Sequence, residues 1–265
     1  MTRSGLLVAI VASAAAPLLL WASCSHHQAA TGLRQEERLA LADDLAAKGK
    51  WAKAVVQYEK VLNEFPRPQV AEAAKFGLAR CRMEAEDYDT AVTEFKDFID
   101  GYPKSDRVDD ATYMIAKCYL RQSAGVDRDQ AKTVEALDEL NLLLRKYPDS
   151  DIRPAVEESI MEASGKLAQK EYQSGQLYFR MGDYKSAAIY FDYVVSEYGD
   201  TPWAERALLD KGEALERQGL RDEAAEAYRR IVEEFPATAA GREAAGRLER
   251  LGGEGGADPQ SPPGP

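Results

Sequence analysis

Six side chains in two segments that lie 37 residues apart have the types needed to bind a peptide end. They are an aromatic residue, a cation and a flexible apolar residue, then an aromatic residue and two cations: Phe76, Arg80, Met83, Tyr113, Lys117 and Arg121. We call them the groove set. The aromatic residues would receive apolar side chains, and the three cations would bind a terminal carboxylate. The alternative is that the aromatic residues pack in the core and the cations are solvated.

Residues that usually carry catalysis or bind metals are few. The two histidines, His26 and His27, are adjacent, and the three cysteines are far apart. A zinc site or a histidine-based triad needs more partners than these. We therefore expect a protein that is not an enzyme, with no catalytic residues, no metal site and no cofactor.

The charge balance argues against nucleic acid as a partner. The chain has 34 Lys and Arg against 45 Asp and Glu, a net charge of −11. Binding to a duplex depends on cations that neutralise phosphates, so we expect no nucleic-acid partner. Within so acidic a chain, the three cations of the groove set would create a local positive field.

Two of the cysteines, Cys81 and Cys118, also lie 37 residues apart. Equivalent positions on neighbouring helices are about 9–10 Å apart, beyond the roughly 7 Å Cα separation that a disulfide spans. We therefore expect two partly buried free thiols.

The N-terminus has the order of an export signal. Arg3 is followed by an apolar stretch and by the small pair Ala22-Ser23 directly before Cys24. This order resembles a bacterial lipobox, although Trp21 stands where Leu is preferred. The prediction is a lipoprotein signal peptide at 1–23, lipidation (including palmitate) of Cys24, and a polar tether at 24–35. The alternative is an ordinary cleaved signal peptide.

The body of the chain repeats one helical pattern five times. An alanine is followed after four, seven and eight residues by large apolar residues, and after eleven by an aromatic one. These offsets share one face of an α-helix, so the pattern predicts five equivalent amphipathic helices. The anchor alanines are Ala54, Ala91, Ala136, Ala187 and Ala224, and the aromatic residues are Phe65, Tyr102, Tyr147, Tyr198 and Phe235.

Each of these helices is preceded by another that carries a small residue at the expected crossing point. The small residues are Ala42, Ala79, Ala116, Gly175 and Gly212, and Gly49, Gly182 and Gly219 mark turns between paired helices. This is the tetratricopeptide pattern, a helical hairpin of about 34 residues. The spacings of 37, 45, 51 and 37 residues between anchors place one insertion near 123–128 and another in a long helix near 153–180.

We therefore predict an all-α fold, a right-handed α-α superhelix of five tetratricopeptide repeats over residues 36–251. A C-terminal capping helix is expected at about 240–251 and a disordered tail at 252–265. In such repeats the positions three before, one after and four after the small crossing residue face the concave groove. Phe76, Arg80 and Met83 hold these positions in repeat two. In repeat three they are held by Tyr113, Lys117 and Leu120, with Arg121 adjacent to the last, and repeat one breaks the pattern with Leu39, Asp43 and Ala46.

Residues 166–208 resemble repeat four of the BamD family of outer-membrane assembly lipoproteins. The matching positions are Leu167, Ala168, Glu171, Tyr178, Gly182, Tyr184, Ala187, Ala188, Tyr198, Asp200 and Thr201. Gly199 replaces the family's proline, and Tyr190 stands where many relatives carry an arginine that pairs with BamA. With the signal, the lipid-type cysteine and the repeats, the resemblance extends over nearly the whole chain.

The resemblance implies a scaffold that is lipid-anchored in the outer membrane and faces the periplasm. Its implied partners are a BamA-like barrel protein, held through the C-terminal repeats, other subunits of the assembly complex, and unfolded outer membrane protein precursors. The alternative is another tetratricopeptide lipoprotein adaptor, for Tol–Pal coordination or for pilus or secretin assembly. An accessory that brings a hydrolase to the cell wall would need a sugar groove or a catalytic domain, and the sequence has neither.

Overall fold

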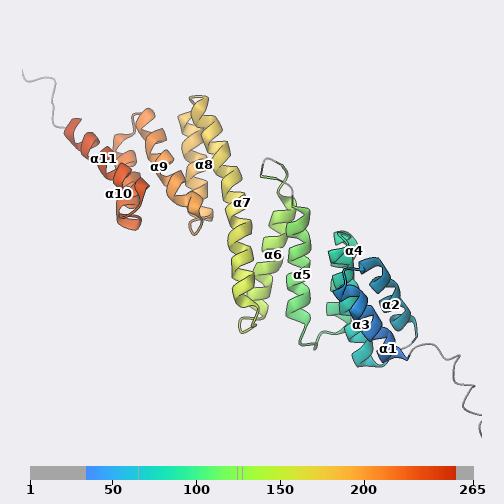
Figure 1. Cartoon of the computed structure of the whole chain (residues 1–265). Coiled ribbons are helices and arrows are strands. Elements are labelled where there is room, and N and C mark those ends of the chain that lie inside the picture. Colours follow the sequence, from blue (N-terminus) through green and yellow to red (C-terminus); the bar gives the residue numbers. More distant parts are fainter. Residues whose placement is uncertain (1–33, 65, 124, 127, 255–265) are drawn as a thin grey trace, which may run out of the picture.

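The computed structural model describes residues 34–64, 66–123, 125–126 and 128–254 of the chain. The predicted signal peptide, Cys24, the two histidines and the last residues of the tail lie outside this part. The described part consists of α-helices that follow one another in a row and contains no β-strand, which confirms the all-α class (Figure 1). The helices are α1 (Gln35–Ala47), α2 (Trp51–Asn63), α3 (Pro68–Glu84), α4 (Tyr88–Gly101), α5 (Val108–Gln122), α6 (Ala131–Lys146), α7 (Arg153–Arg180), α8 (Tyr184–Glu197), α9 (Pro202–Arg217), α10 (Arg221–Glu234) and α11 (Ala239–Glu254).

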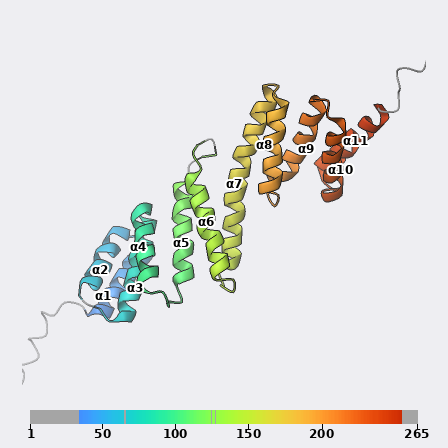
Figure 2. The same ribbon diagram turned by 180° about the vertical axis from the view of Figure 1, so that it is seen from behind.

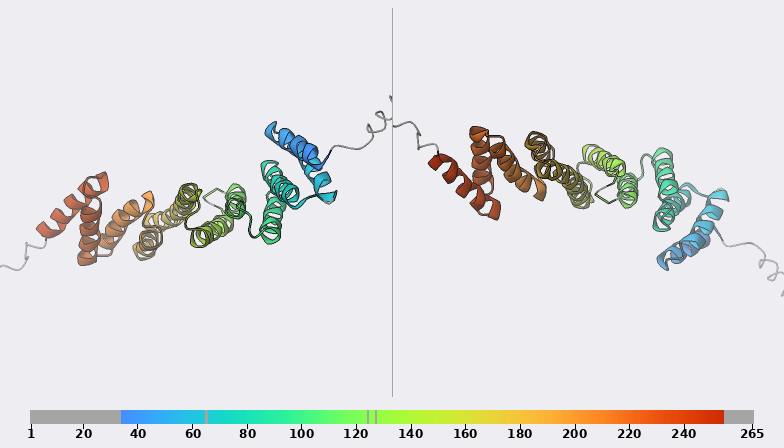
Figure 3. Two further views of the ribbon diagram at one scale, coloured as in Figure 1. Left: turned by 90° about the horizontal axis from the view of Figure 1, so that it is seen from below. Right: turned by 90° about the horizontal axis from the view of Figure 1, so that it is seen from above.

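These helices form five hairpins, α1–α2 through α9–α10, and each packs on the next along the chain. Seen from the front, the back, above or below, they follow one another in sequence order, with α1 and α11 at opposite ends (Figures 1, 2 and 3). The apolar core is accordingly divided into successive clusters along the array. Such an array buries each apolar face only by stacking, as the repeat pattern predicts.

Small residues allow the two helices of a hairpin to approach closely, as predicted. Ala42, Ala79 and Ala116 are completely buried. A Cβ atom on Gly175 would lie 2.7 Å from the Phe191 ring, and one on Gly212 would lie 2.4 Å from the Tyr228 ring. Because no real Cβ packs that closely, the large rings can fill these crossings only above glycine.

The turns between paired helices confirm the left-handed positions expected from glycine. Gly49, Gly182 and Gly219 have φ angles of 68°, 81° and 79°. In the second hairpin the same position holds Glu86, at φ 64°. This conformation is costly for a residue with a Cβ, so the turn of this hairpin carries local strain.

Both insertions lie where the spacing predicts them. The first forms the connection between α5 and α6. The second makes α7 a helix of 28 residues, the longest of the described part. The first half of α7 packs beside α6, and its second half packs against α8 and α9. One continuous helix therefore serves two neighbouring hairpins.

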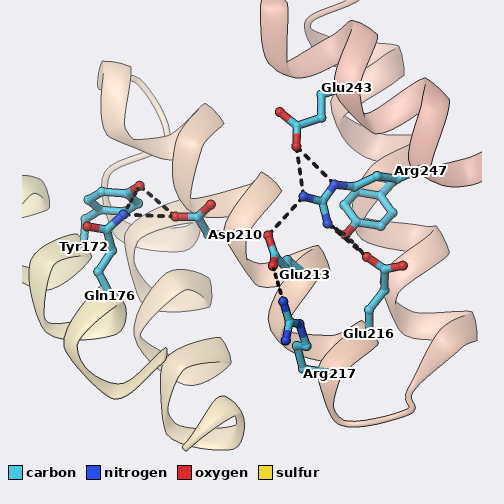
Figure 4. A network of polar contacts seen from close by, with 9 residues as sticks. Tyr172, Gln176, Asp210, Glu213, Glu216, Arg217, Glu243 and Arg247 are labelled. Carbon is cyan, nitrogen blue, oxygen red and sulfur yellow. Dashed lines mark hydrogen bonds and ion pairs between the residues drawn. The ribbon is translucent and has the colours of Figure 1, made fainter. Parts of the chain in front are cut away.

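The predicted cap is α11, which packs on α10 and α9. Its Arg247 donates hydrogen bonds to Glu213 (3.0 Å) and Glu216 (3.1 Å) of α9, and to Glu243 (2.9 Å) of α11 (Figure 4). The guanidinium also lies 5.7 Å from the centre of the Tyr228 ring. Charged hydrogen bonds to α9 therefore hold the cap in place, in addition to the packing of its apolar face.

Candidate peptide-binding site

The groove set lies on two helices that stand side by side in the stack. Phe76, Arg80 and Met83 belong to α3, and the other three residues belong to α5. The matched spacing therefore does bring the six residues onto neighbouring helices. Their exposure differs from one residue to the next, and this decides which of them can contact a ligand.

The apolar members on α3 are core residues, which corrects the prediction that they receive a peptide. Phe76 is 7% exposed, and its ring packs edge-on at 5.8 Å from Phe95 and 5.3 Å from Phe98. Met83 is 2% exposed in the same cluster. The physical reason is that α3 packs against both α2 and α4, so that most of its circumference is covered.

Tyr113 is also occupied by a structural role. Its hydroxyl lies 3.0 Å from the Ser159 hydroxyl and donates to the Ala155 carbonyl of α7 at 3.3 Å. The half-buried ring packs with the cluster around Leu140 and Val156. Tyr113 thus joins α5 to α7 and offers at most one face of its ring.

The cations of the groove set remain available. Arg80 is exposed and Lys117 is half-buried, and neither forms an ion pair with any residue in the described part. The Lys117 ammonium lies 5.4 Å from the centre of the Tyr113 ring. Arg121 is exposed and pairs loosely with Glu84 of α3, at 3.5 Å. Surface pairs of this kind contribute little to stability, so a ligand carboxylate can compete for Arg121.

Arg80 lines an open cavity of about 380 Å³ that α1, α2 and α3 form together. Its other lining residues are Asp43, Ala46, Ala47, Trp51, Tyr58, Gly77, Cys81 and Glu84. The Tyr58 hydroxyl donates a 2.6 Å hydrogen bond to Asp43. Burial, with that hydrogen bond, raises the pKa of Tyr58 above its ordinary value. The cavity therefore combines apolar walls with one cation and two carboxylates.

The sequence analysis missed this cavity, although one signal pointed to it. Asp43 stands 37 residues before Arg80, at the position where repeat one breaks the groove pattern. The close contact between Gly77 and Tyr58, across neighbouring hairpins, was not visible in the sequence. A Cβ on Gly77 would lie 2.5 Å from the Tyr58 ring, so glycine at this point lets α3 approach α2.

Cys81 and Cys118 are free and buried, as predicted, and burial raises their thiol pKa to about 11 and about 12. Both thiols are therefore protonated and unreactive at neutral pH.

Within the described ranges, no group of histidine, cysteine, aspartate and glutamate side chains could hold a metal ion. No helix among the described residues is long and apolar enough to cross a membrane.

Comparison with known proteins gives one family over most of the chain. The model of the YfiO family, described as outer membrane lipoprotein, matches residues 38–231. The chain is 28% identical over 181 residues to the outer membrane protein assembly factor BamD of Caulobacter vibrioides, which covers 68% of this chain and 59% of that protein. It is 31% identical over 197 residues to the putative BamD of Aquifex aeolicus, with 70% and 64% covered. The chain thus spans about three fifths of the length of these two relatives.

Solved structures with a similar arrangement are repeat proteins of low sequence identity. The TPR2AB domain of yeast Sti1, in a complex with an Hsp90 peptide, is 14% identical, with a TM-score of 0.44 and 83% and 84% of the two chains covered. A tetratricopeptide protein of Thermus thermophilus is 19% identical, with a TM-score of 0.36 and 82% and 98% covered.

Proposed function

The chain belongs to the outer membrane lipoprotein family, and on this premise we propose that it is a scaffold of β-barrel assembly at the outer membrane. The observation that carries the proposal is the extent of the family match, residues 38–231, which runs from within α1 to within α10 and so includes part or all of each of the five hairpins. Relatives at 28% and 31% identity are named as assembly factors. A stack of helical hairpins supports the role of a scaffold, because it presents long surfaces to other polypeptides.

The attachment to the membrane is assigned to Cys24. Acylation of this residue would anchor the chain, since each buried methylene contributes about 0.8 kcal/mol. The array would then face the periplasm. In cells fed labelled palmitate, the wild-type chain should carry the label and sediment with outer membranes. Cys24→Ser should lose the label and leave the membrane fraction, and a Cys24→Ser chain that stays membrane-bound would overturn the anchor.

The N-terminal hairpins are assigned the binding of unfolded barrel precursors. The support is the pair of unpaired cations, Arg80 and Lys117, with the cavity beside Arg80. An extended peptide would place its carboxylate among the cations and an apolar side chain in the cavity, with no contact to the buried Phe76 or Met83.

This assignment is tested with a fluorescent peptide that ends in an aromatic residue and a free carboxylate. Arg80→Glu combined with Lys117→Glu should weaken its binding by about tenfold, the equivalent of 1.4 kcal/mol. Lys53→Glu combined with Lys96→Glu exchanges two exposed cations of α2 and α4 and serves as the charge-matched control. Equal affinities for the two double variants would overturn the assignment.

The C-terminal hairpins are assigned to a BamA-like barrel protein and other subunits of the complex. Co-purification from outer membranes of the source bacterium tests the whole proposal. Recovery of a large β-barrel protein with periplasmic domains is the expected result. Recovery of a secretin or of a Tol component in its place would overturn it, and would favour the other adaptor roles.

A further inference from the structure

A second cavity, of about 340 Å³, lies where α7 passes from α6 to α8. Residues from α6, from the first half of α7 and from the turn between α8 and α9 line it, among them Leu144, Ile160, Met161, Glu197, Tyr198 and Asp200. We call it the notch. None of the groove set takes part in it.

The notch exists because of the insertion in α7. The spacing between anchors is 51 residues here and 37 in the first and last intervals. The added length moves α8 along the helix, away from α6. Leu144 and Ile160 belong to the core cluster on one side, and Tyr198 belongs to the cluster on the other. The two core clusters therefore each supply part of the wall of the notch.

Apolar surface is exposed in and beside the notch. Met161 is 47% exposed, and the neighbouring Tyr193, whose ring meets Tyr198 edge-on at 6.0 Å, is 45% exposed. Single exposed apolar residues are ordinary on a protein surface. Here, however, they adjoin a concave site with apolar walls, which is the form of a site that receives an apolar side chain.

The charged residues that line the notch have one sign. Three of its lining residues are acidic and none is a cation. Glu157 pairs with Arg153 at 2.8 Å. Glu197 and Asp200 form no ion pair with any residue in the described ranges. The unpaired carboxylates therefore favour a cationic group on whatever fills the notch.

We propose that the notch binds a basic, apolar segment of a partner polypeptide. An apolar side chain enters between Leu144 and Met161, and a neighbouring Lys or Arg lies against Glu197 and Asp200. The chain's own tail does not fit this chemistry, because residues 255–265 contain no Lys or Arg. This inference deepens the proposed function and rests on it, since the segment would belong to a subunit that the scaffold holds.

Two fluorescent synthetic peptides test the charge requirement by anisotropy. One has the sequence Lys-Leu-Phe-Lys-Leu-Lys, and the other replaces each Lys by Glu. The wild-type chain should bind the basic peptide and should not bind the acidic one. Glu197→Lys combined with Asp200→Lys should weaken binding of the basic peptide by about tenfold.

The matched control is Glu226→Lys combined with Glu233→Lys, which changes the net charge equally at two exposed positions of α10, away from the notch. It should change the affinity by less than about twofold, because screened charges at a distance act weakly. Equal losses in both double variants, or no loss in either, would overturn the proposal. Far-UV circular dichroism checks that each variant is folded.

Met161→Gln tests the apolar part of the proposal. The side chain is half exposed, so the substitution leaves the core intact. Affinity for the basic peptide should fall by about threefold, and an unchanged affinity would overturn the assignment of Met161. The co-purification test of the scaffold is independent: recovery of the barrel protein together with a failed peptide test overturns the notch alone.

Discussion

The two ends of the array differ in the side chains that they leave exposed. In α1–α6 the cations Arg80 and Lys117 are unpaired, while aromatic residues such as Phe76 are buried. In α7–α11 the cation Arg247 is held by three carboxylates, whereas Met181 and Ile189 are 69% and 62% exposed. The most exposed large apolar side chains of the described part therefore lie in the second half, and the two unpaired cations of the groove set lie in the first. This suits an array that binds different partners along its length.

The largest expected effect comes from opening a cavity at the same point in each half of the array, α1–α6 and α7–α11, which tests whether the two halves are independent. Phe95→Ala and Phe191→Ala remove completely buried rings at equivalent positions. Each should cost about 3–5 kcal/mol. If the halves unfold separately, hydrogen exchange should show faster opening only of the half that carries the substitution. Equal acceleration throughout would show that the array unfolds as one unit, and the halves would then differ in surface alone.

The next effect concerns the cap. Arg247→Ala leaves Glu216, which is mostly covered, without its cation, and it leaves Glu213 with only the pair to Arg217 at 3.3 Å. Stability measured by urea unfolding should fall by about 2 kcal/mol, with α11 opening first in hydrogen exchange. Arg230→Ala, which removes an exposed pair with Glu234 on α10, is the control and should cost less than about 0.5 kcal/mol. Comparable losses in the two variants would contradict the role of Arg247.

A smaller effect, of opposite sign, is expected in the turn of the second hairpin. Glu86→Gly relieves the positive φ of that residue, as glycine already does at Gly49. The free energy of unfolding, measured by thermal denaturation, should rise by about 0.5–1 kcal/mol. Glu86→Ala keeps the Cβ atom and should give no such gain. A gain from Ala as large as that from Gly would point to charge rather than to backbone strain.

The smallest expected effect is a pH-dependent change in stability that comes from Asp210. Asp210 of α9 is partly buried and accepts hydrogen bonds from Tyr172 (2.7 Å) and Gln176 (3.5 Å) of α7 (Figure 4). Burial raises the pKa of Asp210 above its ordinary value of 3.8, against the effect of these two hydrogen bonds. Glu213 raises this pKa further, and Arg247 lowers it.

Because the unfolded chain ionises this carboxyl more readily than the folded chain, the ionised form costs stability at neutral pH. The cost disappears as the pH falls through the raised pKa and below 3.8. Asp210→Asn should therefore melt at a higher temperature than the wild type at pH 7, with a difference that shrinks toward pH 4. A difference that is constant with pH would contradict this account.

Much of the fold could be predicted because it repeats. Five anchor alanines in one register predict the hairpins, and the unequal spacings predict both insertions. Whether the Phe76 side chain faces the groove or the core could not be predicted in the same way. A helix packed on two sides buries residues on most of its faces, so periodicity alone does not separate a groove position from a core position.

The contacts of Arg247 and the notch could not be predicted either. Arg247 meets Glu213 from 34 residues away, on a helix whose sequence shows only an amphipathic pattern. The length of the α7 insertion was visible, but the cavity depends on how far it displaces α8 from α6. Such features arise from the relative placement of elements, which a single sequence does not encode locally.

The continuous α7 has a mechanical consequence. At 1.5 Å per residue, its 28 residues form a rod roughly 40 Å long that links the first hairpins to the last. Figure 1 shows α7 in the middle of the array, with α1–α6 on one side and α8–α11 on the other, so the direction of this rod sets how the two groups of helices are placed. A slight bend near its midpoint, at Gly165, would swing the cap through a much longer arc. A partner that fills the notch, which α6, α7 and the turn after α8 line together, would hold these elements at a fixed angle to one another.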